Sequence, residues 1–343
     1  MSHSLVVDLR ARAPIWAIPE SAESRLQAAK PSGWDVHIVA APTVSDGDGA
    51  TAPSEEVRTA MANAEAYFGF GISRPLWLEA HALRWVHSAA AGVGSALFPE
   101  MRDSPVILTN SAGVHAVPIA EHVVGGVLFL LRGFDIARAN QHARRWNREV
   151  FTAADSPMRE MRECRVLVIG AGGLGSAIAR RLALLGASCT GVRRHPERGA
   201  PTGFTRVVGE NEWQLLLGET DILVIAAPAT SETRGMVGGA QLDRLPAHAI
   251  VVNVARGSLL DEGALAQRVA SGRLRGAHLD VFDEEPLSPD SPLWDLASVL
   301  ITPHVSGVSR GFWEREMDLF LDNWRRYVAG EPMRNVVDKA AGY

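Results

Sequence analysis

Near the middle of the chain stands the stretch Arg165-Val166-Leu167-Val168-Ile169-Gly170-Ala171-Gly172-Gly173-Leu174-Gly175. A run of apolar, mostly β-branched residues leads into glycines spaced G-x-G-x-x-G, and an amphipathic segment follows as far as Gly186. This order predicts a strand, a tight turn and a helix. In such a unit Gly170 permits the sharp turn, Gly172 lets the backbone approach a pyrophosphate, and Gly175 lets the helix pack closely on the strand.

Glycines at this spacing also occur in ordinary turns of α/β proteins, so the prediction depends on the flanking strand and helix. With both present, the pattern indicates a dinucleotide whose phosphates lie at the positive N-terminus of the helix. The residues that we expect to line this phosphate turn are Gly170, Gly172, Gly173, Leu174 and Gly175.

The end of the next predicted strand bears on which dinucleotide binds. An NAD-binding unit places an acidic residue there to hold the ribose hydroxyls, but this chain has Arg193, Arg194 and His195. Guanidinium groups can pair with the additional phosphate of NADP, which a carboxylate would repel. The sequence therefore predicts NADP(H) in preference to NAD(H). The alternative is that these arginines form only a solvated turn.

Composition places the chain among soluble globular proteins with two domains. It has 343 residues, 47% of them hydrophobic, and a net charge of −5, which argues against nucleic acid as a partner. The longest apolar run, from Val123 to Leu131, is too short to cross a bilayer, and no signal peptide is evident at the start. Cys164 and Cys189 lack metal or redox spacing. We expect no metal, two reduced core cysteines and a cytoplasmic protein.

Strand-length apolar runs alternate with helical patterns through most of the chain, which predicts an α/β fold with parallel sheets. In the first third, Ser54 is a plausible N-cap for a helix that begins at Glu55, and residues 41–53 indicate a surface loop. A single long helix is predicted from Pro118 to about Ala143. The first third has five predicted strands, and the later part has six: 5–7, 36–39, 67–70, 83–86, 106–108, and then 165–169, 187–192, 221–225, 250–254, 276–281, 299–301.

Three of the later strands are followed by residues whose side chains can take part in catalysis, namely Arg256, Glu285 and His304. Ligands of doubly wound sheets bind beyond the carboxyl ends of the strands. Each residue alone has an ordinary interpretation as a surface charge, a turn or a structural histidine. Together they suit hydride transfer to a 2-oxo acid. Arg256 can bind the carboxylate and polarise the carbonyl, and His304 can donate a proton to the carbonyl oxygen. Glu285 would orient the imidazole and favour its protonated form.

The first domain has no phosphate-binding glycine pattern, so we expect it to bind substrate. Its small-residue loop from Ser88 to Gly94 can present backbone N–H groups to a carboxylate. An ordinary turn is an equally good interpretation of this composition.

Motifs in a fixed order from about Leu83 to Gly307 resemble the D-isomer-specific 2-hydroxyacid dehydrogenases. The resemblance rests on segments 110–115, 120–122, 170–175, 227–235, 252–262, 279–287, 291–294 and 302–304. It implies that Arg256, Glu285 and His304 are catalytic, and that substrate is bound by Arg256, His304 and the backbone of Ala91, Gly92 and Val93. It further implies cofactor contacts, besides the phosphate turn and the two arginines, at Ala227, Pro228, Thr233, Val254, Ala255, Asp280 and His304.

The same resemblance implies an interleaved layout of two doubly wound domains. A Rossmann cofactor domain, residues 109–305, would be inserted into a flavodoxin-like substrate domain made of residues 1–108 and 306–343. In this family the long helix and the arm after it usually build a homodimer.

In lacking an acidic residue near Arg193, the chain is similar to NADPH-preferring glyoxylate and hydroxypyruvate reductases. We therefore expect a reductase of small 2-oxo acids that gives the D-2-hydroxy acid. Gly92-Val93-Gly94-Ser95 lacks the aspartate of many members, which leaves the substrate subgroup open. The alternatives are a dinucleotide-sensing regulator on the same scaffold and an enzyme like phosphoglycerate dehydrogenase. Formate dehydrogenase is disfavoured because it is expected to carry an amide where Glu285 stands.

Overall fold

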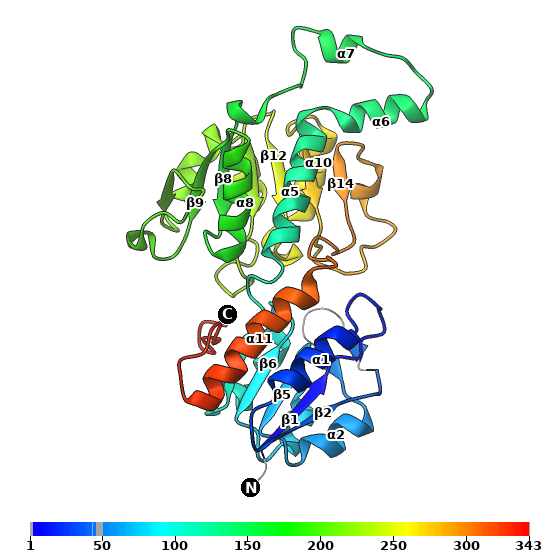
Figure 1. The fold of residues 1–343 in the computed structure, drawn as a ribbon. Coiled ribbons are helices and arrows are strands. Elements are labelled where there is room, and N and C mark those ends of the chain that lie inside the picture. The colour runs from blue at the N-terminus through cyan, green and yellow to red at the C-terminus, as the bar shows by residue number, and fades with distance from the viewer. Residues whose placement is uncertain (1–2, 43, 46–50, 343) are drawn as a thin grey trace. The chain divides into compact units, whose positions relative to one another are not determined.

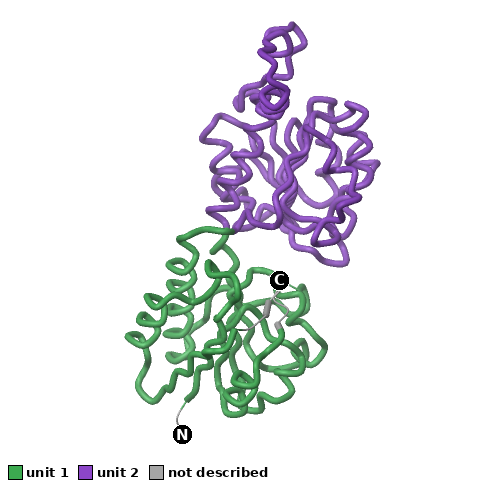
Figure 2. Tube along the Cα trace, turned by 90° about the vertical axis from the view of Figure 1, so that its right-hand side faces the viewer, with its two compact units in different colours: residues 1–115, 308–343 green, residues 116–307 purple. Residues whose placement is uncertain are grey.

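A computed structural model describes residues 3–42, 44–45 and 51–342 of the chain. They form two compact units, residues 1–115 with 308–343 and residues 116–307 (Figure 2). The first unit is thus built from both ends of the chain, and its first segment continues past residue 108. The second is one continuous segment.

The first unit contains a five-stranded parallel sheet in the order β2-β1-β5-β6-β7 (Figure 1). All five strands of this sheet fall on the predicted apolar runs, shifted by one or two residues at their ends. Residues 41–53, predicted as a loop, include a short antiparallel pair, β3 with β4; residues 43 and 46–50 lie outside the described ranges. The strands are β1 (His3–Asp8), β2 (Trp34–Ile38), β3 (Val44–Ser45), β4 (Thr51–Ala52), β5 (Ala66–Gly69), β6 (Trp85–Ser88) and β7 (Ile107–Asn110).

Helices cover both faces of this sheet. On one face α1 and α11 bury Leu26 and Phe320, and Phe320 stacks on Phe68 of β5 with ring centroids 3.9 Å apart. On the other face α2, α3 and α4 form a separate core. The Ser54 hydroxyl accepts the N–H of Val57, so the predicted N-cap is confirmed. The helices are α1 (Glu20–Ala29), α2 (Glu55–Met61), α3 (Arg74–Glu79), α4 (Pro99–Asp103), α11 (Phe312–Ala329) and the 3-10 turn Gly94–Ala96.

The second unit contains a seven-stranded parallel sheet in the order β10-β9-β8-β11-β12-β13-β14. Six of these strands were predicted, and β10 was not. This strand has only three residues, of which Arg206 is exposed and Val208 alone is buried, so it carries almost no apolar signal. The strands are β8 (Arg165–Ile169), β9 (Ser188–Val192), β10 (Arg206–Val208), β11 (Ile222–Ile225), β12 (Ile250–Asn253), β13 (Gly276–Leu279) and β14 (Val299–Ile301).

One face of this sheet packs against α5 and α8, and the other against α9, α10 and several 3-10 turns. Cys164 and Cys189 are free and buried, as expected. The helices are α5 (Ala116–Leu131), α6 (Phe134–His142), α7 (Glu149–Thr152), α8 (Gly173–Leu184), α9 (Gly239–Leu242) and α10 (Glu262–Ala270). The 3-10 turns are Met161–Glu163, Pro196–Arg198, Trp213–Glu219, Gly257–Leu259 and Pro292–Asp295.

The prediction of one helix from Pro118 to Ala143 is wrong. The chain bends by 67° between α5 and α6, because Gly133 adopts a left-handed conformation with φ of +64° at the start of α6. From there α6 and α7 form an arm, residues 134–158, that leads away from the rest of the second unit (Figure 1). Within the described ranges no single helix is long and apolar enough to span a membrane; by length and composition only the bent pair α5 and α6 passes that test.

Candidate active site

The glycine-rich turn joins β8 to α8 as the sequence predicts. Gly170 has φ of +102°, and a Cβ there would lie 2.6 Å from the carbonyl oxygen of Ala226. A Cβ at Gly175 would lie 2.0 Å from the carbonyl oxygen of Gly170, so glycine is needed for this close approach of helix and turn. Gly172 and Gly173 instead face open space, with no atom within 4 Å of an added Cβ. The turn thus leaves room at the helix N-terminus for a pyrophosphate.

Arg193 and Arg194 follow β9 directly. Arg193 Nη1 donates to the carbonyl oxygen of Gly199 at 3.1 Å. Arg194 Nη2 donates to the Glu232 carboxylate at 2.5 Å, and its Nε lies 3.5 Å from that of Glu210. Surface ion pairs of this kind contribute little to stability. Both guanidinium groups can therefore exchange these partners for a ligand phosphate at small cost.

Other residues expected at the cofactor follow β11, the central strand of the sheet, and its neighbour β12. Thr233 organises the turn after β11, since its hydroxyl donates to the carbonyl of Pro228 at 2.7 Å and accepts the N–H of Thr230 at 2.8 Å. Leu174 lies in the first turn of α8 and packs on the core of the second unit. Three small or apolar residues at the strand ends are almost fully buried: Ala227, Val254 and Ala255.

Arg256, Glu285 and His304 follow β12, β13 and β14, which are consecutive neighbours in the sheet. Parallel strands end at the same edge, so the three segments start from one edge of this unit. The first two segments are in contact, because a Cβ at Gly257 would lie 1.8 Å from the carbonyl carbon of Phe282. Only glycine after the arginine allows this approach.

His304 and Glu285 form the hydrogen-bonded pair that the sequence predicts. Nδ1 of the imidazole lies 2.7 Å from Oε2 of the carboxylate, and each side chain is 37% exposed. The other carboxylate oxygen accepts the N–H of Phe282 at 2.9 Å. A carboxylate only accepts hydrogen bonds, so Nδ1 carries the hydrogen. Within the described part of the chain, Nε2 has no hydrogen-bond partner and is the nitrogen available for proton transfer.

The Arg256 turn is shaped by a buried asparagine that sequence reasoning missed. Asn253 Nδ2 donates to the carbonyl of Arg256 at 2.9 Å, and its Oδ1 accepts the N–H of Ala255 at 3.1 Å. The guanidinium Nη1 donates to the carbonyl of Ala255 at 2.6 Å. Asn253 ends a strand of buried apolar residues. An asparagine at the end of an apolar run is a sequence signal for a buried amide, which must find hydrogen-bond partners.

Glu262, at the start of α10, is a second missed residue. Its Oε1 accepts the N–H of Asp283 at 2.7 Å and so supports the segment that carries Glu285. Burial raises its pKa, as do the charges of Asp283, Glu285 and Asp261, against the lowering effect of that hydrogen bond. Four carboxylates thus lie near one another at this segment, those of Asp261, Glu262, Asp283 and Glu285.

Asp280, expected near the nicotinamide amide, is fully buried. Its carboxylate accepts three hydrogen bonds, from the hydroxyl of Thr302 at 2.6 Å and from the N–H groups of Val305 and Ser306 at 2.9 and 3.0 Å. Its carbonyl accepts the N–H of His304 at 2.8 Å. The structure therefore places Asp280 beneath the segment that carries the imidazole.

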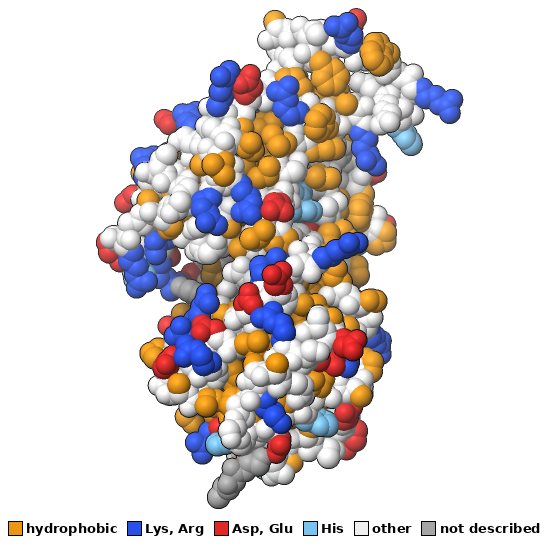
Figure 3. Space-filling view, viewed as in Figure 1, with side chains coloured by type: hydrophobic (Ala, Val, Ile, Leu, Met, Phe, Trp, Pro, Cys, Tyr) orange, Lys and Arg blue, Asp and Glu red, His pale blue; other side chains and the backbone are white. Residues whose placement is uncertain are grey.

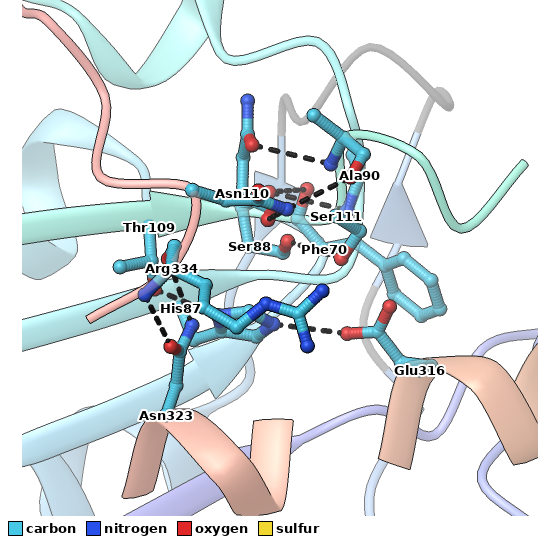
Figure 4. Close-up of polar contacts among 12 residues, drawn as sticks. Phe70, His87, Ser88, Ala90, Thr109, Asn110, Ser111, Glu316, Asn323 and Arg334 are labelled. Atoms are coloured by element: carbon cyan, nitrogen blue, oxygen red, sulfur yellow. Dashed lines mark hydrogen bonds and ion pairs between the residues drawn. The ribbon is translucent and has the colours of Figure 1, made fainter. Parts of the chain in front are cut away.

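In the first unit, the loop after β6 is held from below by a buried polar network (Figure 4). Asn110 Nδ2 donates to the carbonyl of Ala91 at 2.9 Å, and the N–H of Ser111 donates to the carbonyl of Ala90 at 3.2 Å. The Ser111 hydroxyl donates to the carbonyl of Ser88 at 2.8 Å. With these carbonyls turned inward, the N–H groups of residues 91–93 make no hydrogen bond to any described residue.

A sequence model for the NAD binding domain of D-isomer specific 2-hydroxyacid dehydrogenases matches residues 124–306, more than half of the chain. The chain belongs to this family. Glyoxylate/hydroxypyruvate reductase A of Salmonella heidelberg (strain SL476) is 33% identical to this dehydrogenase over 273 residues, 78% of the present chain and 84% of that protein. This dehydrogenase is accordingly an NAD(P)-dependent oxidoreductase.

Solved structures of relatives have the same two-sheet architecture over the whole length of both chains. A D-isomer specific 2-hydroxyacid dehydrogenase from Xanthobacter autotrophicus Py2, in complex with NADPH and MES, is 31% identical with a TM-score of 0.80. The NADPH-dependent glyoxylate/hydroxypyruvate reductase of Sinorhizobium meliloti, in complex with NADP and sulfate, is 28% identical with a TM-score of 0.79.

Proposed function

We propose that this dehydrogenase is an NADPH-preferring reductase of small 2-oxo acids, such as glyoxylate or hydroxypyruvate, and gives the D-2-hydroxy acid where the product is chiral. The observation that carries the proposal is the His304–Glu285 pair beside the Arg256 turn, at the sheet edge that also bears the glycine-rich turn. The names of the relatives from Salmonella and Sinorhizobium support the substrate class.

The three side chains divide the chemistry. Arg256 binds the substrate carboxylate and polarises its 2-oxo group. His304 donates the proton on Nε2 to the developing alkoxide oxygen, and Glu285 keeps the ring oriented through Nδ1 during that transfer. A bound reduced nicotinamide would supply the hydride, and the carbon of the polarised 2-oxo group would accept it. In the reverse direction Nε2 accepts the hydroxyl proton.

The loop of residues 91–93 in the first unit offers backbone donors for a carboxylate, and we propose it as a substrate-binding segment. Successive N–H groups that point out of a turn bind carboxylates well. Ser111 and Asn110 hold the carbonyls of Ala90 and Ala91, and the Ala90 contact can be followed in Figure 4. The N–H groups of residues 91–93 make no hydrogen bond to a described residue. An ordinary turn would instead use some of these donors internally.

The preference for NADPH is proposed from Arg193 and Arg194 at the end of β9, where an NAD-binding unit carries an acidic residue. Guanidinium groups there can pair with a ribose phosphate. The complexes of the Xanthobacter and Sinorhizobium relatives with NADPH and NADP support this choice.

We further propose that a second copy of the chain covers α5 and the arm. Figure 3 shows hydrophobic side chains gathered on the surface of the second unit where α5 runs. Val117 of α5 is 38% exposed, and on the arm Phe134 is 54% and Trp146 is 93% exposed. An apolar surface of this kind is typical of a protein interface. A homodimer is the expected state in solution.

The direct test is oxidation of NADPH and NADH with a panel of 2-oxo acids. Absence of turnover with every acid and both cofactors would overturn the enzymatic proposal, and tight NADPH binding in that case would favour the dinucleotide-sensing alternative. His304→Gln is expected to lower kcat by about 10² to 10⁴, the usual range for general acid catalysis. Its affinity for NADPH, measured by fluorescence titration, should stay near that of the wild type.

A further inference from the structure

A line of hydrogen bonds connects α5 with the segment that carries the proposed catalytic imidazole. His122, in the middle of α5, places Nε2 3.0 Å from Oγ1 of Thr302, which follows β14. The Thr302 hydroxyl donates to Oδ1 of Asp280 at 2.6 Å. The same carboxylate accepts the N–H groups of Val305 and Ser306, directly after His304. All of these residues belong to the second unit.

The proton directions in this line are determined by the chemistry of its members. A carboxylate only accepts, so the single hydroxyl hydrogen of Thr302 is committed to Asp280. The Thr302 oxygen can then only accept from His122, which must carry its hydrogen on Nε2. A neutral His122 with that tautomer and a charged His122 both meet this requirement.

At the other end of this line of hydrogen bonds, His304 has a backbone conformation that its surroundings must stabilise. His304 has φ of +53°, a left-handed conformation that a residue other than glycine adopts only when its surroundings enforce it. Its N–H donates to the carbonyl of Asp280 at 2.8 Å, and the two following N–H groups donate to the Asp280 carboxylate. The same residue thus fixes three consecutive backbone N–H groups around the imidazole.

The near end of the line is held by packing. The ring of His122 lies 4.7 Å from that of fully buried His278 on β13. A Cβ at Gly126 of α5 would lie 2.0 Å from Nδ1 of His278, so the absence of a side chain there makes room for the second ring. The titratable groups that face His122 are therefore His278 and Asp280, whose Oδ1 lies 3.8 Å from Nε2.

We propose that His122 is a positioning residue for the proton donor: through Thr302 and Asp280 it holds residues 304–306 in the conformation that directs the imidazole to Glu285. The proposal rests on the proposed role of His304. His122 itself takes no part in proton transfer, and its contribution is the donor on Nε2 at one end of the line.

The test compares variants that keep or remove each donor. His122→Phe keeps the ring and removes the donor, whereas His122→Gln can place an amide N–H near the position of Nε2. Thr302→Val removes the hydroxyl with little change in shape, and Thr302→Ser keeps it. His81→Phe, at an exposed histidine of the first unit, is the control for the exchange itself. Glyoxylate reduction with NADPH is measured from pH 6 to 9.

We expect His122→Phe and Thr302→Val each to lower kcat about tenfold, a fraction of the ~10²-fold loss that a 1 Å displacement can cause. Their KM for NADPH should change less than about twofold. His122→Gln and Thr302→Ser should recover most of kcat. Because both changes break one line, the double variant His122→Phe/Thr302→Val should lose no more than about twofold beyond the slower single variant.

The proposal is overturned if kcat of His122→Phe matches the wild type, if His122→Gln is as slow as His122→Phe, or if the two losses multiply in the double variant. If His122→Phe fails to fold, the Thr302 pair decides by the same criteria. In all of these cases His304→Gln stays slow and the proposed function stands. Wild-type turnover by His304→Gln would instead overturn the proposed role of His304.

Discussion

His278 makes the stability of the second unit depend on pH in a way that can be calculated. Burial lowers its pKa to about 4, assisted by neighbouring His122 and opposed by Asp280. Its ring nitrogens have no hydrogen-bond partner among the described residues, so nothing in the fold compensates a charge on the ring. In the unfolded chain a histidine has a pKa of about 6.5.

The sign follows from proton linkage. Because the folded-state pKa is the lower one, the folded form is not penalised above pH 6.5, and stability is lost as pH falls from 6.5 towards 4. At pH 5 the unfolded chain holds a proton at His278 that the folded chain mostly lacks. From the gap between 6.5 and about 4, lowering the pH from 7 to 5 removes about 2 kcal/mol of unfolding free energy through this residue.

His278→Leu should therefore remove about 2 kcal/mol of the pH dependence between pH 7 and 5. Hydrogen-exchange protection of β13 peptides, corrected for intrinsic rates, reports the unfolding free energy of this unit at both pH values. A titration of the imidazole C–H resonances, assigned by its loss in the variant, gives the pKa directly. His81→Leu is the control for loss of an exposed imidazole. The reasoning is refuted if the resonance titrates near 6.5 or if the variant retains the wild-type pH dependence.

Three further predictions concern other parts of the second unit. Gly175→Ala should abolish NADPH binding in a fluorescence titration, because the new Cβ would lie 2.0 Å from a backbone oxygen; retained affinity would contradict the packing of helix and turn. Asp221→Asn should lower the unfolding free energy at pH 7 by about 2 kcal/mol, the size expected for lost hydrogen bonds to a charged group. Burial alone would raise the pKa of Asp221, but hydrogen bonds from Arg165, Arg159 and His248 lower it overall. Its contribution to the unfolding free energy is therefore present above about pH 4. In urea titrations, the difference between wild type and variant should shrink as pH falls below about 4. Arg194→Ser should lower the ratio of kcat/KM for NADPH to that for NADH, whereas Glu232→Gln, which removes one carboxylate partner of that guanidinium, should raise it; an unchanged ratio in both would exclude Arg194 from phosphate recognition.

Much of the fold could be predicted from the sequence because buried parallel strands are nearly continuous runs of β-branched and other apolar residues. Segments such as Ile250–Asn253 and Ile222–Ile225 stand out for this reason. The short strand Arg206–Val208 has no such run and was missed. The break at Gly133 was missed too, because one glycine inside an apolar helical pattern is often tolerated and only its left-handed φ ends the helix.

The part of the site that depends on strand order could be predicted from the sequence. Residues that directly follow neighbouring parallel strands meet at one edge, so Glu285 and His304 could be paired from the sequence. The supporting contacts could not, because they join distant residues through side-chain geometry. His122 and Thr302 are 180 positions apart, and neither lies in a motif whose spacing predicts the other. Likewise, the hydrogen bond that holds the Ala91 carbonyl in this loop comes from Asn110, which belongs to a different strand.

The origin of the first unit from both ends of the chain affects how the protein is made. Phe312, Phe320 and Trp324 of α11 are part of the core that also contains Leu5 and Val7 of β1. A ribosome must therefore translate as far as α11 before β1 finds its final packing partners. Residues 116–307 are contiguous and meet no such delay, so the later-synthesised unit can fold first while the amino-terminal part waits incomplete, an inversion of the usual vectorial order.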